Sequence, residues 1–165
     1  MNIYVVSGKG VGKTQLSAFD AALKDAGVHN YNLICLSSII PPHSNIIVSE
    51  RYNTPEDEYG HKLYVVRATI SSGKVGESLA AGVGWYRPEG DGRGLFVEHE
   101  TCGEGEETVK KKVEQDIKNS LMDLCGFRGI EFDESRLHML VTSATVTEQP
   151  ASALVIAVYQ AKGWD

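Results

Sequence analysis

One stretch decides the fold of this chain: Asn32-Leu33-Ile34-Cys35-Leu36-Ser37-Ser38-Ile39-Ile40-Pro41-Pro42. Its apolar run is typical of a buried strand. The strand must stop at the two prolines, because proline cannot donate a ladder hydrogen bond and also restricts the residue before it. The pair Ser37-Ser38 is therefore expected where a strand ends.

A serine pair in this position has two interpretations. The ordinary one is a turn, since serines favour turns and prolines end strands. The other is self-processing: if the peptide bond between Ser37 and Ser38 is strained, the Ser38 hydroxyl can attack the Ser37 carbonyl and convert the amide to an ester. β-Elimination and loss of ammonia would then leave a pyruvoyl group. Spacing alone favours the turn.

Motifs on both sides of the serine pair change this balance. The chain carries, in order, Ser17-Ala18-Phe19-Asp20-Ala21-Ala22-Leu23, Ala26-Gly27, Asn32-Leu33-Ile34, Ser37-Ser38-Ile39, Pro41-Pro42 and Gly94-Leu95-Phe96-Val97-Glu98. In order and approximate spacing these resemble the pyruvoyl-dependent arginine decarboxylases, from about the first expected strand to the last. The resemblance implies a four-layer αββα sandwich that assembles as a homotrimer or a dimer of trimers. It also implies self-cleavage of a single domain, residues 1–165, into a β chain (1–37) and an α chain (38–165).

Length and composition agree with one domain of mixed structure. The chain has 165 residues, 42% of them hydrophobic, and 17 glycines, which suits an α+β fold with tight turns. Its net charge of −6 argues against nucleic acid as a partner and suits a cationic substrate. Periodicity alone gives no more than one α+β domain.

Targeting and cysteine patterns predict a soluble cytoplasmic protein. The chain begins without a charged, apolar leader, and no apolar run approaches the length of a membrane span. Cys35, Cys102 and Cys125 are odd in number and lack metal-ligand spacing, so we expect reduced thiols. The five histidines are scattered over separate elements, and we expect no metal site.

Hydrophobic periodicity places two helices among several strands. Thr14 is expected to cap a helix that Gly27 ends, and apolar residues four apart predict a second helix over Glu106–Cys125, closed by Gly126. The remaining apolar segments are expected as strands at Ile3–Val6, Leu63–Ile70, Gly76–Trp85, Gly94–Glu98, Leu137–Val146 and Ala153–Tyr159. The polar segment Ser49–Lys62 is expected as a surface loop.

Ser7-Gly8-Lys9-Gly10-Val11-Gly12-Lys13-Thr14 invites a second functional interpretation. A phosphate-binding loop also follows a strand, opens a helix and ends in Gly-Lys-Thr. Here the spacing from Gly8 to Gly12 is one residue too short, and Ser7 stands where the pattern needs glycine. We therefore expect a glycine-rich turn between strand and helix, with a non-catalytic nucleotide-binding module as the alternative.

Decarboxylation of an amino acid needs an electrophilic carbonyl to take up the electrons left on the α carbon. A pyruvoyl group made from Ser38 would supply it, through a Schiff base with the substrate amine. Glu98 matches the family's proton donor, and its apolar strand is expected to withdraw the carboxyl from water. Glu100, two residues along the same strand face, is the fallback. On the residues alone, a strand-end carboxylate facing solvent is the simpler interpretation of Glu98.

Two further side chains gain roles from the resemblance. Asn32 corresponds to the family's asparagine implicated in processing and catalysis, and an amide can hydrogen-bond a developing oxyanion without titrating. Asp20 matches the aspartate that contacts the substrate guanidinium, with which a carboxylate forms a bidentate pair. On helical spacing Asp20 falls beside Leu16 at the edge of an apolar face, where a boundary residue paired with a cation is the simpler interpretation.

The expected reaction is therefore conversion of L-arginine to agmatine and CO2. A pyruvoyl decarboxylase acting on histidine or lysine is the nearest alternative, since lysine also presents a positive charge to Asp20. A relative that neither cleaves itself nor catalyses is another.

Overall fold

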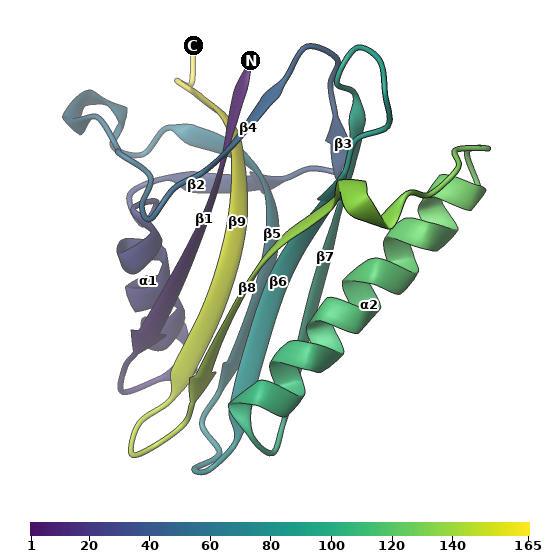
Figure 1. Ribbon diagram of the computed structural model, residues 1–165. Coiled ribbons are helices and arrows are strands. Elements are labelled where there is room, and N and C mark those ends of the chain that lie inside the picture. Colours follow the sequence, from purple (N-terminus) through teal and green to yellow (C-terminus); the bar gives the residue numbers. More distant parts are fainter.

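Residues 1–165 form two β-sheets and two long helices in the computed structural model (Figure 1). The helices are α1 (Gln15–Ala26) and α2 (Glu106–Gly126). The strands are β1 (Asn2–Val11), β2 (Asn32–Cys35), β3 (Ile39–Ile40), β4 (Asn45–Val48), β5 (Lys62–Ser72), β6 (Ser78–Tyr86), β7 (Gly94–Gly103), β8 (Leu137–Thr145) and β9 (Ala151–Lys162). Two single-turn 3-10 helices lie at Glu56–Glu58 and Glu134–Arg136. The expected α+β domain is confirmed.

Strand order places the two ends of the chain side by side in one sheet. The five-stranded sheet runs β2-β5-β9-β1-β4, with β9 antiparallel to both β1 and β5, and the edge strands β2 and β4 parallel to their neighbours. The four-stranded sheet runs β3-β7-β6-β8 and is antiparallel throughout. Neither sheet can form until distant segments meet, because most neighbouring strands are far apart in sequence.

Three apolar clusters hold these elements together. The largest lies between the sheets and includes Val5, Val66, Val83 and Phe96. The second packs α1 on the five-stranded sheet, and the third packs α2 on the four-stranded sheet. In Figure 1 the helices lie on opposite sides of the molecule, α1 beside β1 and α2 in front of β6 and β7. Burial follows strand alternation, so each sheet presents one apolar face to the other sheet and one to its helix.

The helix boundaries confirm the sequence prediction. The Thr14 side chain accepts a hydrogen bond from the Ser17 amide, and the Ser17 hydroxyl closes a reciprocal capping box. Gly27 adopts the left-handed conformation, with φ of 86°, and ends α1. In α2 the residues four apart are buried as expected: Val109, Val113, Ile117 and Leu121.

The stretch from Asn32 to Pro42 is not one buried strand, as predicted, but two short strands in different sheets. β2 forms an edge of the five-stranded sheet and is only partly covered, while β3 pairs with β7 in the other sheet. The chain passes from one sheet to the other through Leu36, Ser37 and Ser38. The sequence predicts one strand here because the residues of an edge strand and the residues of a strand that faces a second sheet are equally apolar, so the break between them has no apolar signal. The serine pair therefore lies at a crossing between sheets.

The glycine-rich segment that follows Val6 is also corrected. Ser7 to Val11 continue β1, pairing with β9 up to Val11 and Ala151, so Gly8 and Gly10 do not form a turn. A Cβ on Gly10 would lie 2.2 Å from the carbonyl oxygen of Ala18 in α1. The glycines allow close packing of helix and strand. The nucleotide-binding alternative is wrong. A segment that pairs with a neighbouring strand does not form the loop of free amides that binds phosphates.

Three smaller findings complete the fold. β4, missing from the sequence prediction, pairs with β1 through Asn45 to Val48. Cys35 and Cys102 are exposed, Cys125 is buried, and none forms a disulfide. Neither helix combines the length and the apolar character needed to span a membrane.

Candidate active site

Ser38 has an unusual backbone conformation. Its φ is 67°, in the left-handed region, and His43 is the only other non-glycine residue with positive φ. An L residue in this region costs about 1–2 kcal/mol, and such conformations persist only where surrounding contacts fix them. The backbone of Ser38 is thus held in a conformation that is unfavourable for an L residue.

Contacts from both sheets fix the segment after Ser37. The amide of Phe96 in β7 donates to the Ser38 carbonyl at 2.8 Å. The hydroxyl of Tyr159 in β9 donates to the next carbonyl, that of Ile39, at 2.9 Å. Pairing of Ile39 with Leu95 holds the same segment against β7.

The Ser38 hydroxyl donates to the Glu98 carboxylate. The Ser38 Oγ lies 2.8 Å from Glu98 Oε2 and 3.1 Å from Oε1. Glu98 is positioned by β7, where Phe96, Glu98 and Glu100 alternate onto the face toward the other sheet. A carboxylate at this distance can accept the proton of the hydroxyl. The two residues chosen from sequence for chemistry are therefore in direct contact.

The environment of Glu98 differs from the expectation. Glu98 is exposed in the chain, so its strand does not withdraw it from water as predicted. The apolar part of β7 ends at Val97, one residue earlier. Glu100, the fallback acid, has a side chain that is exposed overall, but desolvation raises its pKa above the ordinary value, and the charge of Glu98 adds to this while His99 opposes it. Glu100 does not line the cavity beside Ser38.

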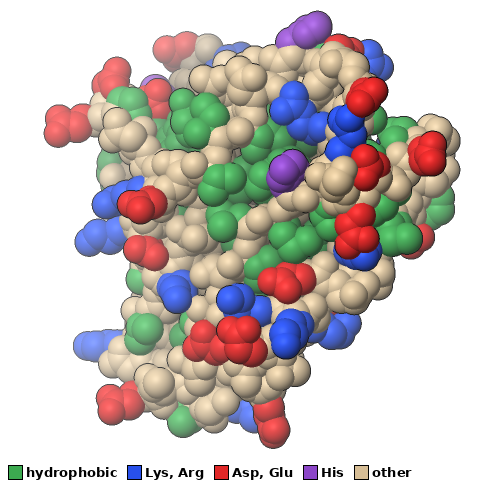
Figure 2. Space-filling model, in the orientation of Figure 1, with side chains coloured by type: hydrophobic (Ala, Val, Ile, Leu, Met, Phe, Trp, Pro, Cys, Tyr) green, Lys and Arg blue, Asp and Glu red, His purple; other side chains and the backbone are tan.

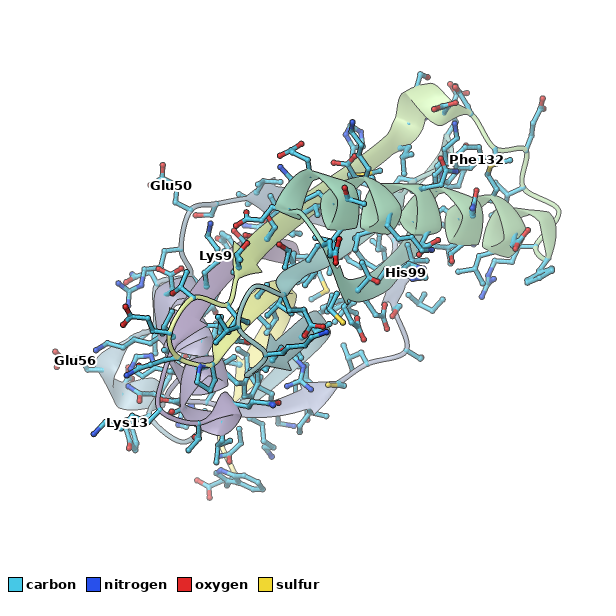
Figure 3. The ribbon with its side chains drawn as sticks, turned by 90° about the horizontal axis from the view of Figure 1, so that it is seen from below. Lys9, Lys13, Glu50, Glu56, His99 and Phe132 are labelled. Atoms are coloured by element: carbon cyan, nitrogen blue, oxygen red, sulfur yellow. The ribbon has the colours of Figure 1, made fainter.

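An open cavity of about 490 Å³ adjoins Ser38. Its walls come from the serine pair, β7 and the C-terminal part of α2, and include Ser38, Glu98, His99, Asp123 and Phe127. The His99 imidazole Nε2 lies 2.7 Å from the Ser120 hydroxyl, and Figure 3 shows His99 beside α2. The cavity is large enough for an amino acid, and three of its lining residues, Glu98, His99 and Asp123, carry ionisable side chains.

The largest cavity of the molecule is elsewhere. It measures about 850 Å³ and lies between β4 and β8, with Arg87, Arg136 and His138 among its lining residues. Figure 2 shows apolar side chains on this face with a histidine and basic side chains beside them. Neither Ser38 nor Glu98 touches it, so size alone does not identify the reactive site. No three His, Cys, Asp or Glu side chains gather as they would around a metal ion.

Asn32 and Asp20 are not brought to Ser38 within one chain. Asn32 begins β2, and its side-chain amide donates to the Gly60 carbonyl at 2.7 Å. Asp20 is exposed on α1, not half-buried as expected, and Leu16 beside it is 76% exposed. In Figure 3, Lys13, just before α1, lies on the far side of the molecule from His99. Neither residue lines the Ser38 cavity.

Sequence reasoning missed two contributors. Phe96 acts through its backbone amide, which carries no residue-specific pattern. Tyr159 ends a run of apolar residues in β9. Its phenol hydroxyl, a polar group at a position that faces the core, was the one available indication of a polar partner.

Comparison with known proteins places this site in a family. The family described as pyruvoyl-dependent arginine decarboxylase matches residues 2–162. A relative of that name from Methanococcoides burtonii is 36% identical over 131 residues, covering 79% of this chain and 71% of the relative. Another from Halobacterium salinarum is 35% identical over 164 residues, covering 95% and 92%. A third, from Pyrococcus furiosus, is 34% identical and covers 89% and 87%.

The fold and the site define an α+β domain in which a serine with positive φ contacts a carboxylate where the chain crosses between two sheets. The chain is a member of the pyruvoyl-dependent arginine decarboxylase family.

Proposed function

We propose that this protein cleaves itself between Ser37 and Ser38 and then converts L-arginine to agmatine and CO2. The observation that carries the proposal is the contact of the left-handed Ser38 with Glu98, at 2.8 Å. Family membership and the names of the relatives support the substrate and the pyruvoyl cofactor.

The contacts of Ser38 support self-processing. Glu98 accepts the hydroxyl proton, and the Ser38 oxygen attacks the Ser37 carbonyl carbon, so that the peptide C–N bond breaks and an ester forms. Loss of the Ser38 α proton then breaks the Cβ–O bond and releases Ser37 as a carboxylate. Water replaces the nitrogen, which leaves as ammonia, and residue 38 becomes pyruvoyl.

The residues present fit this group. Ser38 is half-buried at the wall of an open cavity, and its carbonyl accepts from the Phe96 amide. When formed, the pyruvoyl group supplies the carbonyl that binds the substrate amine and takes up the electron pair released with CO2. Glu98 lies within reach of the same atoms and returns a proton to the α carbon.

Substrate recognition is proposed to need Asp20 from a neighbouring subunit, while Asn32 is proposed to take part in processing and catalysis. Asp20 is exposed and has no hydrogen-bond partner in its own chain, so it is free to pair with a guanidinium. The distance of α1 from the Ser38 cavity favours a homotrimer or dimer of trimers with sites between subunits. Packing of each helix on the outer face of its sheet supports the four-layer αββα sandwich. We propose that the protein works in the cytoplasm, where the agmatine it makes would serve polyamine synthesis or its consumption of protons would serve acid resistance.

Intact mass under denaturing conditions tests the proposal. The purified chain should give fragments 1–37 and 38–165, the larger about 17 Da lighter than a serine-started peptide because ammonia has left. Ser38→Ala should remain one chain and produce no agmatine from arginine. A wild-type protein that stays uncut after long incubation would contradict the proposal and favour a non-catalytic relative.

The same preparation tests the substrate. Cleaved protein should release CO2 from arginine faster than from lysine or histidine, because only guanidinium matches a carboxylate in a bidentate pair. A cleaved protein that prefers lysine or histidine would keep the processing and overturn the arginine assignment.

A further inference from the structure

Tyr159 links the far end of the chain to the serine pair. Its hydroxyl donates to the Ile39 carbonyl at 2.9 Å, across 120 residues of sequence. The side chain is 9% exposed and its ring meets Phe96 edge to face, with 6.0 Å between ring centroids. Such packing holds the phenol in one position.

The link matters because of where the two sheets meet. The Phe96 amide, from the four-stranded sheet, holds the carbonyl of Ser38, while Tyr159, from the five-stranded sheet, holds the carbonyl of the next residue. Two successive carbonyls are thus tied to different sheets. The peptide between Ser38 and Ile39 cannot rotate without breaking one of these bonds, and this is the constraint that a left-handed serine requires.

We propose that Tyr159 is a positioning residue for self-processing: its hydroxyl holds the Ile39 carbonyl so that Ser38 stays left-handed with its hydroxyl on Glu98. This inference rests on the proposed function. The Tyr159 hydroxyl forms its hydrogen bond with the Ile39 carbonyl and not with Ser37 or Ser38, so it acts through the backbone of Ile39.

The state of the phenol agrees with this role. Burial, together with the nearby charge of Glu98, raises the pKa of Tyr159 above its ordinary value of 10.0. The phenol therefore remains protonated, and remains a donor, over the whole working pH range.

The rate of self-cleavage tests the role of Tyr159. Tyr159→Phe keeps the ring and its packing while removing the donor, so the Ile39 carbonyl loses its partner. We expect freshly made Tyr159→Phe protein to convert to the two fragments about tenfold more slowly than wild type, since the hydrogen bond that holds the Ile39 carbonyl is lost. Fragment appearance is followed by denaturing gel and intact mass.

Tyr86→Phe is the matched control. Tyr86 is also a buried tyrosine, and its hydroxyl donates to the Glu131 carbonyl at 3.0 Å and accepts from the Asp133 amide at 3.0 Å, with no bond to the segment from Ser37 to Ile39. The Tyr86→Phe variant should cleave at the wild-type rate, although its melting temperature should fall by at least as much as that of Tyr159→Phe, because it loses both of these bonds. Equal slowing of both variants would show a general loss of stability and overturn the positioning role.

Hydroxylamine locates the affected step. It cuts an ester between Ser37 and Ser38, so it reports how much ester has formed. If Tyr159 positions the attacking hydroxyl, Tyr159→Phe accumulates no more hydroxylamine-sensitive chain than wild type. An excess of ester, or cleavage within twofold of the wild-type rate, would overturn the inference while leaving the proposed function intact. An uncut wild-type chain would overturn both.

Discussion

At the scale of single residues, Ser38 and Glu98 show what sequence can and cannot supply. The pair was chosen from motifs and is in hydrogen-bond contact at 2.8 Å. The predicted shielding of Glu98 is wrong, because the apolar stretch of β7 ends at Val97 and the next residue is exposed. Residue type indicates chemistry, but exposure at the last position of an apolar stretch depends on neighbours that a single sequence does not reveal.

Glu106 offers a test of charge at the residue scale. It opens α2 and accepts hydrogen bonds from Ser143 at 2.8 Å and Thr145 at 2.9 Å, both in β8. These bonds lower the pKa of Glu106 below its ordinary value of 4.5. Because the folded-state pKa is lowered, this stabilisation is present above the unfolded pKa and is lost as pH falls through the folded pKa.

We expect Glu106→Gln to lower the free energy of unfolding by about 1 kcal/mol at pH 7, after allowing for solvent screening. The difference from wild type should shrink as pH falls below about 4.5. Thermal unfolding between pH 3 and pH 7 measures it. Glu107→Gln is the control, since Glu107 shares the first turn but is 80% exposed and contacts only Lys110, at 3.7 Å. A difference independent of pH would contradict the assigned role of the charge.

At the scale of elements, the contact of β1 with α1 depends on glycine. Gly10→Ala would place a Cβ 2.2 Å from the Ala18 carbonyl oxygen and 2.3 Å from the Ala22 amide nitrogen. Backbone atoms of a helix cannot yield as a flexible side chain does, so helix and strand must separate. We expect the free energy of unfolding to fall by about 3 kcal/mol, the upper range for overpacking.

Urea unfolding of Gly10→Ala and Gly126→Ala provides the comparison. A Cβ on Gly126, the last residue of α2, meets no atom within 4 Å. Alanine there should raise stability by up to about 1 kcal/mol, because glycine is a poor helix former. Equal effects of the two substitutions would show that close packing is not the reason for glycine at position 10.

The predicted elements succeeded where the pattern was local. Caps at Thr14 and Gly27 and the four-residue spacing of α2 depend only on neighbouring residues, and all were confirmed. The errors concern pairing. β4 was missed because its partner β1 lies more than 40 residues away, and the stretch after Asn32 was read as one strand because its two halves join different sheets. No local pattern records which sheet a strand joins.

At the scale of the whole molecule, the candidate site is divided. Ser38 and Glu98 lie together, whereas Asp20 lies on α1 and does not line their cavity. A sequence motif preserves the order of residues and not the subunit from which each acts. If Asp20 selects arginine, it must do so in a neighbouring copy, and closed symmetry would give every site one Asp20 from the next subunit.

Mixed oligomers test this division. The Ser38→Ala variant lacks the precursor of the pyruvoyl group but keeps Asp20. The Asp20→Asn variant should still cleave itself but lose its preference for arginine. Each variant alone should therefore be nearly inactive at low arginine. Co-expressed in equal amounts, they form some sites with Ser38 from one variant and Asp20 from the other. Random assembly makes about a quarter of the interfaces wild-type, so activity should return to about a quarter of the wild-type value. The assay is agmatine release at low arginine, with each variant mixed only after separate purification as the control. If the co-expressed protein is no more active than that control, Asp20 does not bind substrate in the site of a neighbouring subunit.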